Sequence, residues 1–510
     1  MEKIVSNVRC MRLVQAVVIL TALAAAGCSG RKKDQRTQKA PSTAQEGKKS
    51  VKGTAAEKKP NLILVVMDTV RADSVSAGGY SRATTPFLDT LVSEGVFFTN
   101  ARSTSSWTHP AHASMFTGLV PSVHSARYAG KDLLKERQGT AAVIPMRKDI
   151  ITLQELLKQA GYTTVGSVGA VLLNPGLGVT RGFESFAPAV VGKDPDAHTV
   201  NTRLLELLDE KPDDGLPVFV FVNYFDAHGP YAAHVEHAPW LEEFENLDAA
   251  DLLERENGIP LFARLCAGTQ KLTDSEWNRI RALYDSEIAF VDHHMKKLFA
   301  ELDSRGILDN ALVIITSDHG EYMGEHGGMA DHGRTLYEEL VHVPLLLWGK
   351  KHVPAGIKID RPVSLRDVFF TFTELAGIEF RFRNPGCSLM AVAKGASCPG
   401  RPLVSEAFAD PAVAPAAPRI FGHDYASVVQ WPFKLIMKSS GETELYDLQK
   451  DPHELNKLTG PFRKKQNELV NIYKSWRLNN PAHKPDLTAI ESQGPGPLTR
   501  ERLKALGYIE

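Results

Sequence analysis

The sequence contains little cysteine, which limits how the chain can be stabilised. Five cysteines in 510 residues are too few for a scaffold built on disulfides. Three of them lie beyond the N-terminal 30 residues, and one bridge among these is possible in an oxidising compartment. The favoured pair is Cys387 and Cys398, which flank a short Gly/Ala/Ser loop, and Cys266 would then be a buried free thiol.

The sequence also lacks an excess of charge of either sign. Its formal net charge is -1, so no global field attracts nucleic acid, and we expect no nucleic-acid partner. The chain is 43% hydrophobic and 23% charged, which is the composition of an ordinary folded protein. Its length is sufficient for one large core and a smaller appended unit.

The N-terminus has the pattern of an export signal over residues 1–28. Three basic residues precede an apolar stretch from 13 to 26, which is too short to span a bilayer comfortably. The stretch ends in Leu-Ala-Ala-Ala-Gly-Cys28, which resembles a bacterial lipoprotein cleavage box and implies that Cys28 becomes lipidated. A plain signal peptide with a fortuitous cysteine is the alternative. We expect an exported cell-envelope lipoprotein, on the periplasmic face of a bacterial membrane or in the outer membrane of a Gram-negative cell.

Composition divides the rest of the chain into a tether and two folded units. Residues 29–60 nearly lack large apolar side chains and predict a flexible linker. From 61 to 403, short apolar runs alternate with longer amphipathic segments, which predicts an α/β catalytic domain with a largely parallel sheet. We expect a small α+β subdomain over 404–510. The expected helices cover 86–94, 153–159, 277–304 and 461–476, with a strand over 434–437.

Three apolar runs predict strands that are buried on both faces. They cover 62–67, 218–222 and 312–315. Each run leads within a few residues to a carboxylate, namely Asp68, Asp226 or Asp318. Ligands bind beyond the carboxyl ends of strands in open α/β sheets, so we expect these acids to converge.

Asp68, Asp318 and the adjacent His319 are the expected ligands of a metal ion. Such mixed oxygen and nitrogen ligands suit Mn, Zn, Mg or Ca to differing degrees, and the imidazole favours the transition metals. The alternative for an Asp-His pair alone is an acid at a strand end that caps the next helix.

The segment 105–118 supplies a hydroxyl nucleophile candidate. Thr108 opens an expected short helix that Gly118 closes, and Pro110 lies in the first turn, where its missing N–H costs little. A helix N-terminus favours an anionic substrate. The alternative is that Thr108 is only an N-cap residue.

These motifs together resemble the sulfatase family of the alkaline phosphatase superfamily. The matching segments are 61–73, 224–231, 315–321, 324–327, 332–338, 343–344, 444–448, 451–452 and 503–508. The resemblance implies a central, mostly parallel sheet flanked by helices, with a small C-terminal α+β subdomain. It also implies one divalent metal ion (Ca, Mn, Zn or Mg) held by Asp68, Thr108, Asp318 and His319, and an anionic ester substrate.

The sequence departs from the family where the chemistry occurs. The family places Cys or Ser in a C/S-x-P-x-R motif and oxidises it to formylglycine, whereas this chain has Thr108 there and His112 in place of the arginine. Thr69 replaces a usual second acid. These differences argue against formylglycine chemistry. Threonine nucleophiles occur in phosphodiesterases and phosphoethanolamine-type transferases of the superfamily, so we expect Thr108 to attack directly.

Histidines and arginines in the matched loops complete the expected site. His112, His228 and His332 are candidate catalytic residues, the last two contacting the substrate or protonating the leaving group. Asp226 and His326 are further helper candidates, and a second metal held by Asp226, His228 and His332 is possible. We expect His228, His326, Arg71 and Arg334 to bind the substrate anion, with salt bridges as the alternative for the arginines.

The predicted function is a metal-dependent hydrolase of sulfate or phosphate esters. Two alternatives stay open: a transferase of phosphoryl headgroups that acts on cell-envelope lipid or glycan, and an inactive binding protein on the same fold. Such transferases usually carry several transmembrane helices before the catalytic domain, which favours the hydrolase. The retained metal ligands and hydroxyl argue against an inactive protein.

Overall fold

The structure is a computed structural model that describes most of the chain after residue 57. The described residues are 58–128, 143–189, 195–211, 214–244, 261–379, 385–398, 401–409 and 418–484. The expected signal segment 1–28 with Cys28, most of the linker 29–60 and the motif at 503–508 lie outside them. Within the described residues, we find no helix that is both long and apolar enough to cross a membrane.

An eight-stranded sheet in the order β14-β2-β13-β9-β1-β8-β6-β7 forms the centre of the fold. Its strands are β1 (Asn61–Met67), β2 (Val96–Phe98), β6 (Thr163–Val168), β7 (Ser185–Ala187), β8 (Val218–Tyr224), β9 (Ala311–Thr316), β13 (Leu345–Trp348) and β14 (Ile357–Ile359). β1 pairs in parallel with β8 and β9, and only β13 runs antiparallel to its neighbours within this sheet. The expected mostly parallel α/β sheet is confirmed.

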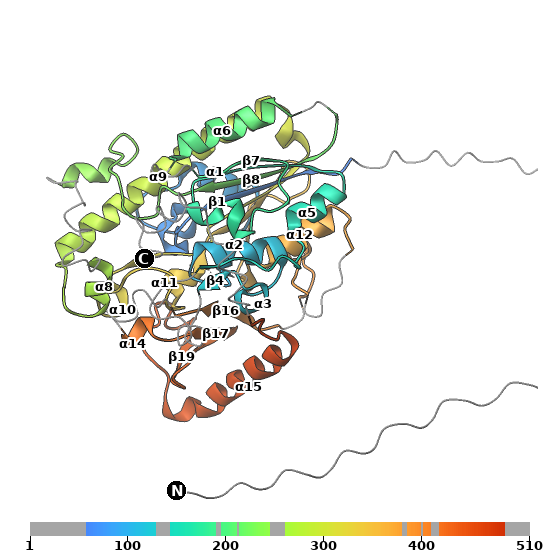
Figure 1. The fold of residues 1–510 in the computed structure, drawn as a ribbon. Coiled ribbons are helices and arrows are strands. Elements are labelled where there is room, and N and C mark those ends of the chain that lie inside the picture. The colour runs from blue at the N-terminus through green and yellow to red at the C-terminus, as the bar shows by residue number, and fades with distance from the viewer. Residues whose placement is uncertain are drawn as a thin grey trace, which may run out of the picture. The chain divides into compact units, whose positions relative to one another are not determined.

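Helices cover both faces of this sheet, as Figure 1 shows. On one face α1 (Pro86–Glu94), α6 (Ala197–Asp209) and α9 (Asp274–Ser304) pack against alternate residues of β1 such as Val65. On the other face α2 (Thr108–Thr117), α5 (Leu153–Gln159) and α12 (Asp367–Leu375) pack against the intervening residues, such as Val66. Successive side chains of a strand point to opposite faces, so the position of a residue in this alternation determines which helices its side chain contacts.

The helix boundaries follow from local capping. α1 and α5 have the predicted bounds. α9 begins at Asp274 rather than at residue 277, because Thr273 and Glu276 form a capping box that satisfies the first N–H groups of the helix. A capping box starting at Thr152 likewise begins α5.

The C-terminal part contains a second, antiparallel sheet in the order β16-β17-β18-β19. The strands are β16 (Leu403–Ala407), β17 (Tyr425–Gln430), β18 (Phe433–Lys438) and β19 (Thr443–Asp447), and α15 (Arg463–Asn479) packs on them through the buried Leu469. Cys387 and Cys398 form a disulfide, and Cys266 is the free cysteine of the described residues.

Short elements connect these layers. They are β3 (Ala101–Arg102), α3 (Pro121–His124), β4 (Arg127–Tyr128), β5 (Val143–Ile144), α8 (Leu261–Cys266), β10 (Tyr322–Met323), α10 (Glu325–Gly328), β11 (Ala330–Asp331), α11 (Glu338–Val341), β12 (His342–Val343), β15 (Val363–Ser364), α13 (Leu389–Ala393) and α14 (Pro418–Phe421).

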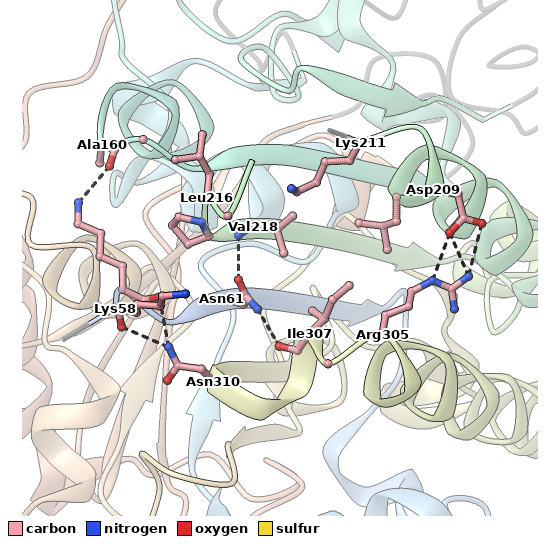
Figure 2. A pocket seen from close by; sticks show the side chains of 16 residues that line it. Lys58, Asn61, Ala160, Asp209, Lys211, Leu216, Val218, Arg305, Ile307 and Asn310 are labelled. Atoms are coloured by element: carbon pink, nitrogen blue, oxygen red, sulfur yellow. Dashed lines mark hydrogen bonds and ion pairs between the residues drawn. The ribbon is translucent and has the colours of Figure 1, made fainter. Parts of the chain in front are cut away.

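A cavity of about 710 Å³ opens at the amino edge of the central sheet (Figure 2). Asn61 at the start of β1 lines it, donating to Ile307 O and accepting from the N–H of Val218. Asp68 follows the opposite end of β1. Because ligands of such sheets bind at the carboxyl edge, this cavity is not the candidate active site.

Candidate active site

Asp68, Asp318 and His319 form a buried cluster at the carboxyl edge of the sheet. One ligand atom from each lies within 4.8 Å of the others, and all three side chains are fully buried. Asp68 follows β1 and Asp318 follows β9. If the alternation of side chains along each strand is continued, both residues point to the face of the sheet that α2 covers. The sequence prediction placed these residues together, and the structure brings them together.

Thr108 lies directly over this cluster. Its Oγ1 is 3.4 Å from Asp68 Oδ1 and 3.2 Å from His319 Nε2. Trp107 holds the N-cap position of α2, so Thr108 is the first helical residue and its hydroxyl faces the cluster. Gly118 ends the helix in the left-handed conformation, as expected. The geometry therefore favours a chemical role for the Thr108 hydroxyl over a capping role.

Two buried carboxylates with oxygen atoms within 4.8 Å of each other repel when both are charged. Burial raises the pKa of Asp318 well above its ordinary value, and the nearby Asp68 raises it further. Burial likewise raises the pKa of Asp68, against the hydrogen bond that Asn223 donates to its Oδ2. Asp318 Oδ2 has no hydrogen-bond partner among the described residues. A cation between the carboxylates would remove both penalties, so these residues fit a metal ion.

The imidazole of His319 is oriented as a metal ligand would be. Its Nδ1 donates to the carbonyl of Gly320 at 2.9 Å, which fixes the ring tautomer. Nε2 consequently carries the lone pair, and it faces Asp318 Oδ2 at 3.4 Å and Asp68 Oδ1 at 3.7 Å. Burial holds the pKa of His319 well below its ordinary value, so the ring is neutral, as metal binding requires.

His112 supports the cluster from one turn further along α2. Its Nδ1 donates to the carbonyl of Thr108 at 2.9 Å and lies 3.4 Å from Asp318 Oδ2. Burial lowers the pKa of His112 to about 3. A neutral imidazole therefore stands where the family motif has a permanently charged arginine, hydrogen-bonded to Thr108 and close to Asp318.

Two neighbouring residues contact the acids of the cluster: Asn223, which sequence reasoning did not find, and Thr69, which stands in place of a usual second acid. Asn223 in β8 donates to Asp68 Oδ2 at 3.1 Å and accepts the N–H of Ala170. It is the one amide in an otherwise apolar and aromatic strand, and that was the available signal. Thr69 adopts φ +62°, which β-branched residues rarely do, and its N–H points at Asp318 Oδ1 at 3.3 Å.

Asp226 does not join the cluster, so the expected convergence of three acids was wrong. Its Oδ1 accepts the N–H of Ala197 at the start of α6, and burial raises its pKa to about 7. Tyr224 of β8 pairs with Met67 of β1 in the parallel register, and both side chains lie on the face that α6 and α9 cover. Asp226, two residues after Tyr224, points to that same face. The possible second metal set of Asp226, His228 and His332 is not formed: the second group of described residues that could hold a metal ion is Glu321, Asp331 and His332.

His332 and His228 lie beside the cluster. The His332 ring centre is 4.5 Å from that of His319 and 4.9 Å from that of His228. The Nδ1 atom of His332 contacts the carboxylates of Glu321 and Asp331, each at 3.2 Å, and the ligand atoms of these three residues lie within 4.8 Å of one another. These two carboxylates were not predicted as part of the site. Proton exchange between His332 and a substrate would use Nε2.

Three expected anion-binding residues are engaged elsewhere. The buried Arg71 guanidinium pairs with Asp73 at 2.7 Å and with Glu325 at 2.6 Å. Only the Arg71 side chain is buried in these pairs, since the Asp73 side chain is 44% exposed and that of Glu325 is 19% exposed. Arg334 pairs with Asp331 and lies over the rings of Phe262 and Phe421. His326 contacts Glu339 Oε2 at 3.0 Å and stacks on Tyr337. All three side chains thus contact side chains outside the Asp68, Asp318 and His319 cluster.

A mostly parallel α/β sheet that sets a hydroxyl against two buried acids and an imidazole is an arrangement suited to metal-assisted attack on an ester. The model of the sulfatase family matches residues 60–378, which is more than half of the chain. The chain belongs to the sulfatase family. The model of the N-sulphoglucosamine sulphohydrolase C-terminal region matches residues 324–478, which include the second sheet and most of α15.

Curated relatives align over most of the chain. A sulfatase of Formosa agariphila is 25% identical over 445 residues, covering 78% of this chain and 82% of the relative. The choline-sulfatase of Rhizobium meliloti is 25% identical over 450 residues, with the same coverage of each chain.

Solved structures share the fold. A structure in complex with its substrate D-glucosamine-2-N,6-O-disulfate has a TM-score of 0.66 at 20% identity, covering 83% of this chain and 98% of the other. The phosphonate monoester hydrolase of Agrobacterium radiobacter has a TM-score of 0.64 at 20% identity, covering 83% of this chain and 96% of the other.

Proposed function

We propose that this hydrolase cleaves anionic phosphate or sulfate esters with Thr108 as a covalent nucleophile. The observation that carries the proposal is the position of Thr108 Oγ1, at 3.4 Å from Asp68 Oδ1 and 3.2 Å from His319 Nε2 inside a buried cluster. Asp68, Asp318 and His319, with the Thr108 hydroxyl, would hold one divalent metal ion. When bound, this ion supplies Lewis acidity that lowers the pKa of a hydroxyl and neutralises developing charge.

The reaction proceeds in two displacement steps. In the first, Thr108 Oγ1 releases its proton to bulk water and forms a bond to the phosphorus or sulfur atom while the ester bond to the leaving alcohol breaks. The leaving oxygen takes a proton from His332, whose pKa the carboxylates of Glu321 and Asp331 raise against the effect of burial. Burial lowers the pKa of His228 to about 3, so His228 is the poorer donor. In the second, water attacks the threonyl ester, Thr108 recovers its proton, and inorganic phosphate or sulfate departs.

Phosphate esters fit a threonine nucleophile better than sulfate esters do. A formylglycine hemiacetal can expel its anion by elimination, whereas a threonyl ester must be cleaved by attack of water on phosphorus or sulfur. The sulfatase names of the relatives keep sulfate esters as the second candidate class. The fold alone does not decide between phosphate and sulfate esters, because proteins of this fold include both a complex with a sulfated sugar and a phosphonate monoester hydrolase.

A substrate panel tests this proposal. Metal-reconstituted protein is incubated with an aryl sulfate, a phosphate monoester, a phosphodiester and a phosphonate ester, and product release is followed. We expect the highest kcat/KM on a phosphorus-centred ester. Turnover of the aryl sulfate alone would overturn the preference for phosphorus, and turnover of none with any divalent metal would favour the transferase alternative.

The position of His332 predicts a dependence on the leaving group. Replacing His332 with asparagine should lower kcat by about 10²-fold or more for an alkyl ester, whose leaving group needs a proton. The loss should be much smaller for a nitrophenyl ester, which departs readily as an anion. His352→Asn is the control, because His352 contacts Asn310 away from the site. Equal losses on both esters would show that His332 does not protonate the leaving group.

We further propose that the protein is a cell-envelope lipoprotein anchored through Cys28, for which the lipoprotein-like sequence at 23–28 is the support. In a bacterial expression host, the wild-type protein should sediment with membranes and label with radioactive palmitate. Cys28→Ser should lose the label and appear in the soluble envelope fraction. Palmitate labelling that persists in Cys28→Ser would contradict this assignment.

A further inference from the structure

Asn223 is a fully buried amide within the central sheet, and both of its side-chain polar atoms are paired. It lies in β8, whose other residues are apolar or aromatic. Its Oδ1 accepts the N–H of Ala170 at 3.0 Å, and its Nδ2 donates to Asp68 Oδ2 at 3.1 Å. A buried amide is costly unless its donor and its acceptor are both satisfied. These two hydrogen bonds therefore explain how a polar side chain is accommodated in this strand.

The backbone around Asn223 allows its amide only one orientation. The main-chain N–H of Ala170 can only donate, so the amide oxygen must face it and the amide NH₂ group must face Asp68. Ala170 is itself held in place, because the preceding Gly169 donates its N–H to the main-chain carbonyl of Asn223 at 2.9 Å. The loop that follows β6 thus fixes the direction in which the Asn223 side chain donates.

Asn223 in turn fixes the plane of the Asp68 carboxylate. β8 lies beside β1 in the central sheet (Figure 1), and the N–H of Asp68 donates to the carbonyl of Tyr224 at 2.9 Å, which anchors the main chain. The hydrogen bond from Asn223 to Oδ2 then restrains rotation of the carboxylate about its Cβ–Cγ bond. The other oxygen, Oδ1, consequently points into the cluster, at 3.4 Å from Thr108 Oγ1 and 3.7 Å from His319 Nε2.

We propose that Asn223 is a positioning residue, which holds Asp68 Oδ1 toward the metal ion and the Thr108 hydroxyl. This inference rests on the proposed function, in which Asp68 is a ligand of the ion. Residues that hydrogen-bond a metal ligand typically contribute about 10- to 100-fold to metal affinity or to activity. Without the amide donor, the Asp68 carboxylate loses the partner that restrains its rotation, so its oxygen spends less time in the geometry that binds the ion.

Asn201 in α6 provides a matched control. It is also a buried amide, and it contacts the same strand, because its Oδ1 accepts the hydroxyl of Tyr224 at 2.8 Å. Its Nδ2 donates to the carbonyl of His294 at 2.9 Å. Both asparagines thus use their amides for two hydrogen bonds in the core, and within the described residues only Asn223 hydrogen-bonds a proposed metal ligand. Loss of Asn201 should therefore leave the metal site intact.

Binding of Mn²⁺ by the full-length protein tests the proposal without any reading of activity. The protein is stripped with a chelator and titrated with Mn²⁺, and the free ion is measured by its electron paramagnetic resonance signal. We expect the Kd to be at least about tenfold higher in Asn223→Leu than in the wild type, and within about twofold of the wild type in Asn201→Leu. A merely structural role of Asn223 would lower the unfolding midpoint of the metal-free protein in both variants and leave both Kd values unchanged. Equal Kd values in the two variants would overturn the proposal.

A second pair of variants and a kinetic reading complete the test. If Asn223→Leu does not fold, Asn223→Ala is compared with Asn201→Ala in the same titration, with the same expected difference in Kd. At saturating Mn²⁺, kcat on the best ester should fall at least about tenfold in the Asn223 variant with KM changed less than about threefold, because Asn223 acts through Asp68 rather than on the substrate. A wild-type protein that binds Mn²⁺ but cleaves no ester would refute the proposed function, and the comparison of Kd values would still decide the role of Asn223.

Discussion

Replacing Thr108 with alanine should lower kcat/KM by at least about 10³-fold, which corresponds to roughly 4 kcal/mol of transition-state stabilisation. The reason is positional: the Thr108 hydroxyl is the alcohol that contacts both Asp68 and His319. Steady-state kinetics on the best ester of the substrate panel measure the effect. Thr108→Ser keeps a hydroxyl at the same place and should retain a substantial part of the activity.

The matched control for this variant lies on the same helix. The Thr117 hydroxyl donates to the carbonyl of Ala113 within α2, so Thr117→Ala removes a hydroxyl of α2 that does not face the cluster. We expect its kcat/KM to stay within about threefold of the wild-type value. Full activity in Thr108→Ala would mean that the attacking group is water or another side chain.

Removal of the metal should abolish turnover and lower the thermal stability of the protein. Asp68 and Asp318 are fully buried with ligand atoms within 4.8 Å of each other, and Asp318 Oδ2 lacks a hydrogen-bond partner among the described residues. Treatment with a chelator should therefore lower kcat by at least about 10³-fold. Readdition of a divalent ion should restore kcat and raise the midpoint of thermal unfolding. Saturation at 100 times the Kd adds about 2.7 kcal/mol to the unfolding free energy.

Asparagine variants of two acids that follow strands, Asp318 and Asp226, test this prediction by comparison with each other. Asp318→Asn removes a proposed ligand and should bind metal at least about tenfold more weakly, with no recovery of activity at ordinary metal concentrations. Asp226→Asn changes a buried acid at the end of β8 whose Oδ1 accepts a backbone N–H, which asparagine can also accept. It should keep the metal-induced rise in the unfolding midpoint. Equal metal responses in the two variants would refute the assigned ligand set.

Sequence reasoning located the central residues because their signals were local. Asp68 and Asp318 each follow an uninterrupted apolar run, and parallel strands end at the same edge of a sheet. Thr108 was found because Gly118 marks the helix end and the family motif marks its start. The structure places all of these residues around one point.

Strand parity explains the error on Asp226. The sequence showed a carboxylate after an apolar run, but the face to which it points depends on the register of β8 against β1. The pairing of Tyr224 with Met67 places Asp226 on the face that α6 covers. This register depends on how β8 pairs with β1, so the apolar run 218–222 alone could not reveal it. For the arginines, the structure shows the salt bridges that were the alternative to anion binding, and the sequence indicated only some of their partners. Arg71 pairs with Glu325, which is distant in sequence and approaches only in the folded chain.

The mass of the Thr108 peptide after rapid acid quenching tests the central proposal most directly. The wild-type enzyme is mixed with a slowly turned-over activated ester, quenched within the first turnovers, digested and analysed by mass spectrometry. The account predicts that the peptide containing Thr108 gains the mass of one phosphoryl or sulfuryl group, and that Thr117→Ala gains it equally. A covalent adduct found only on a peptide without Thr108 would contradict the account.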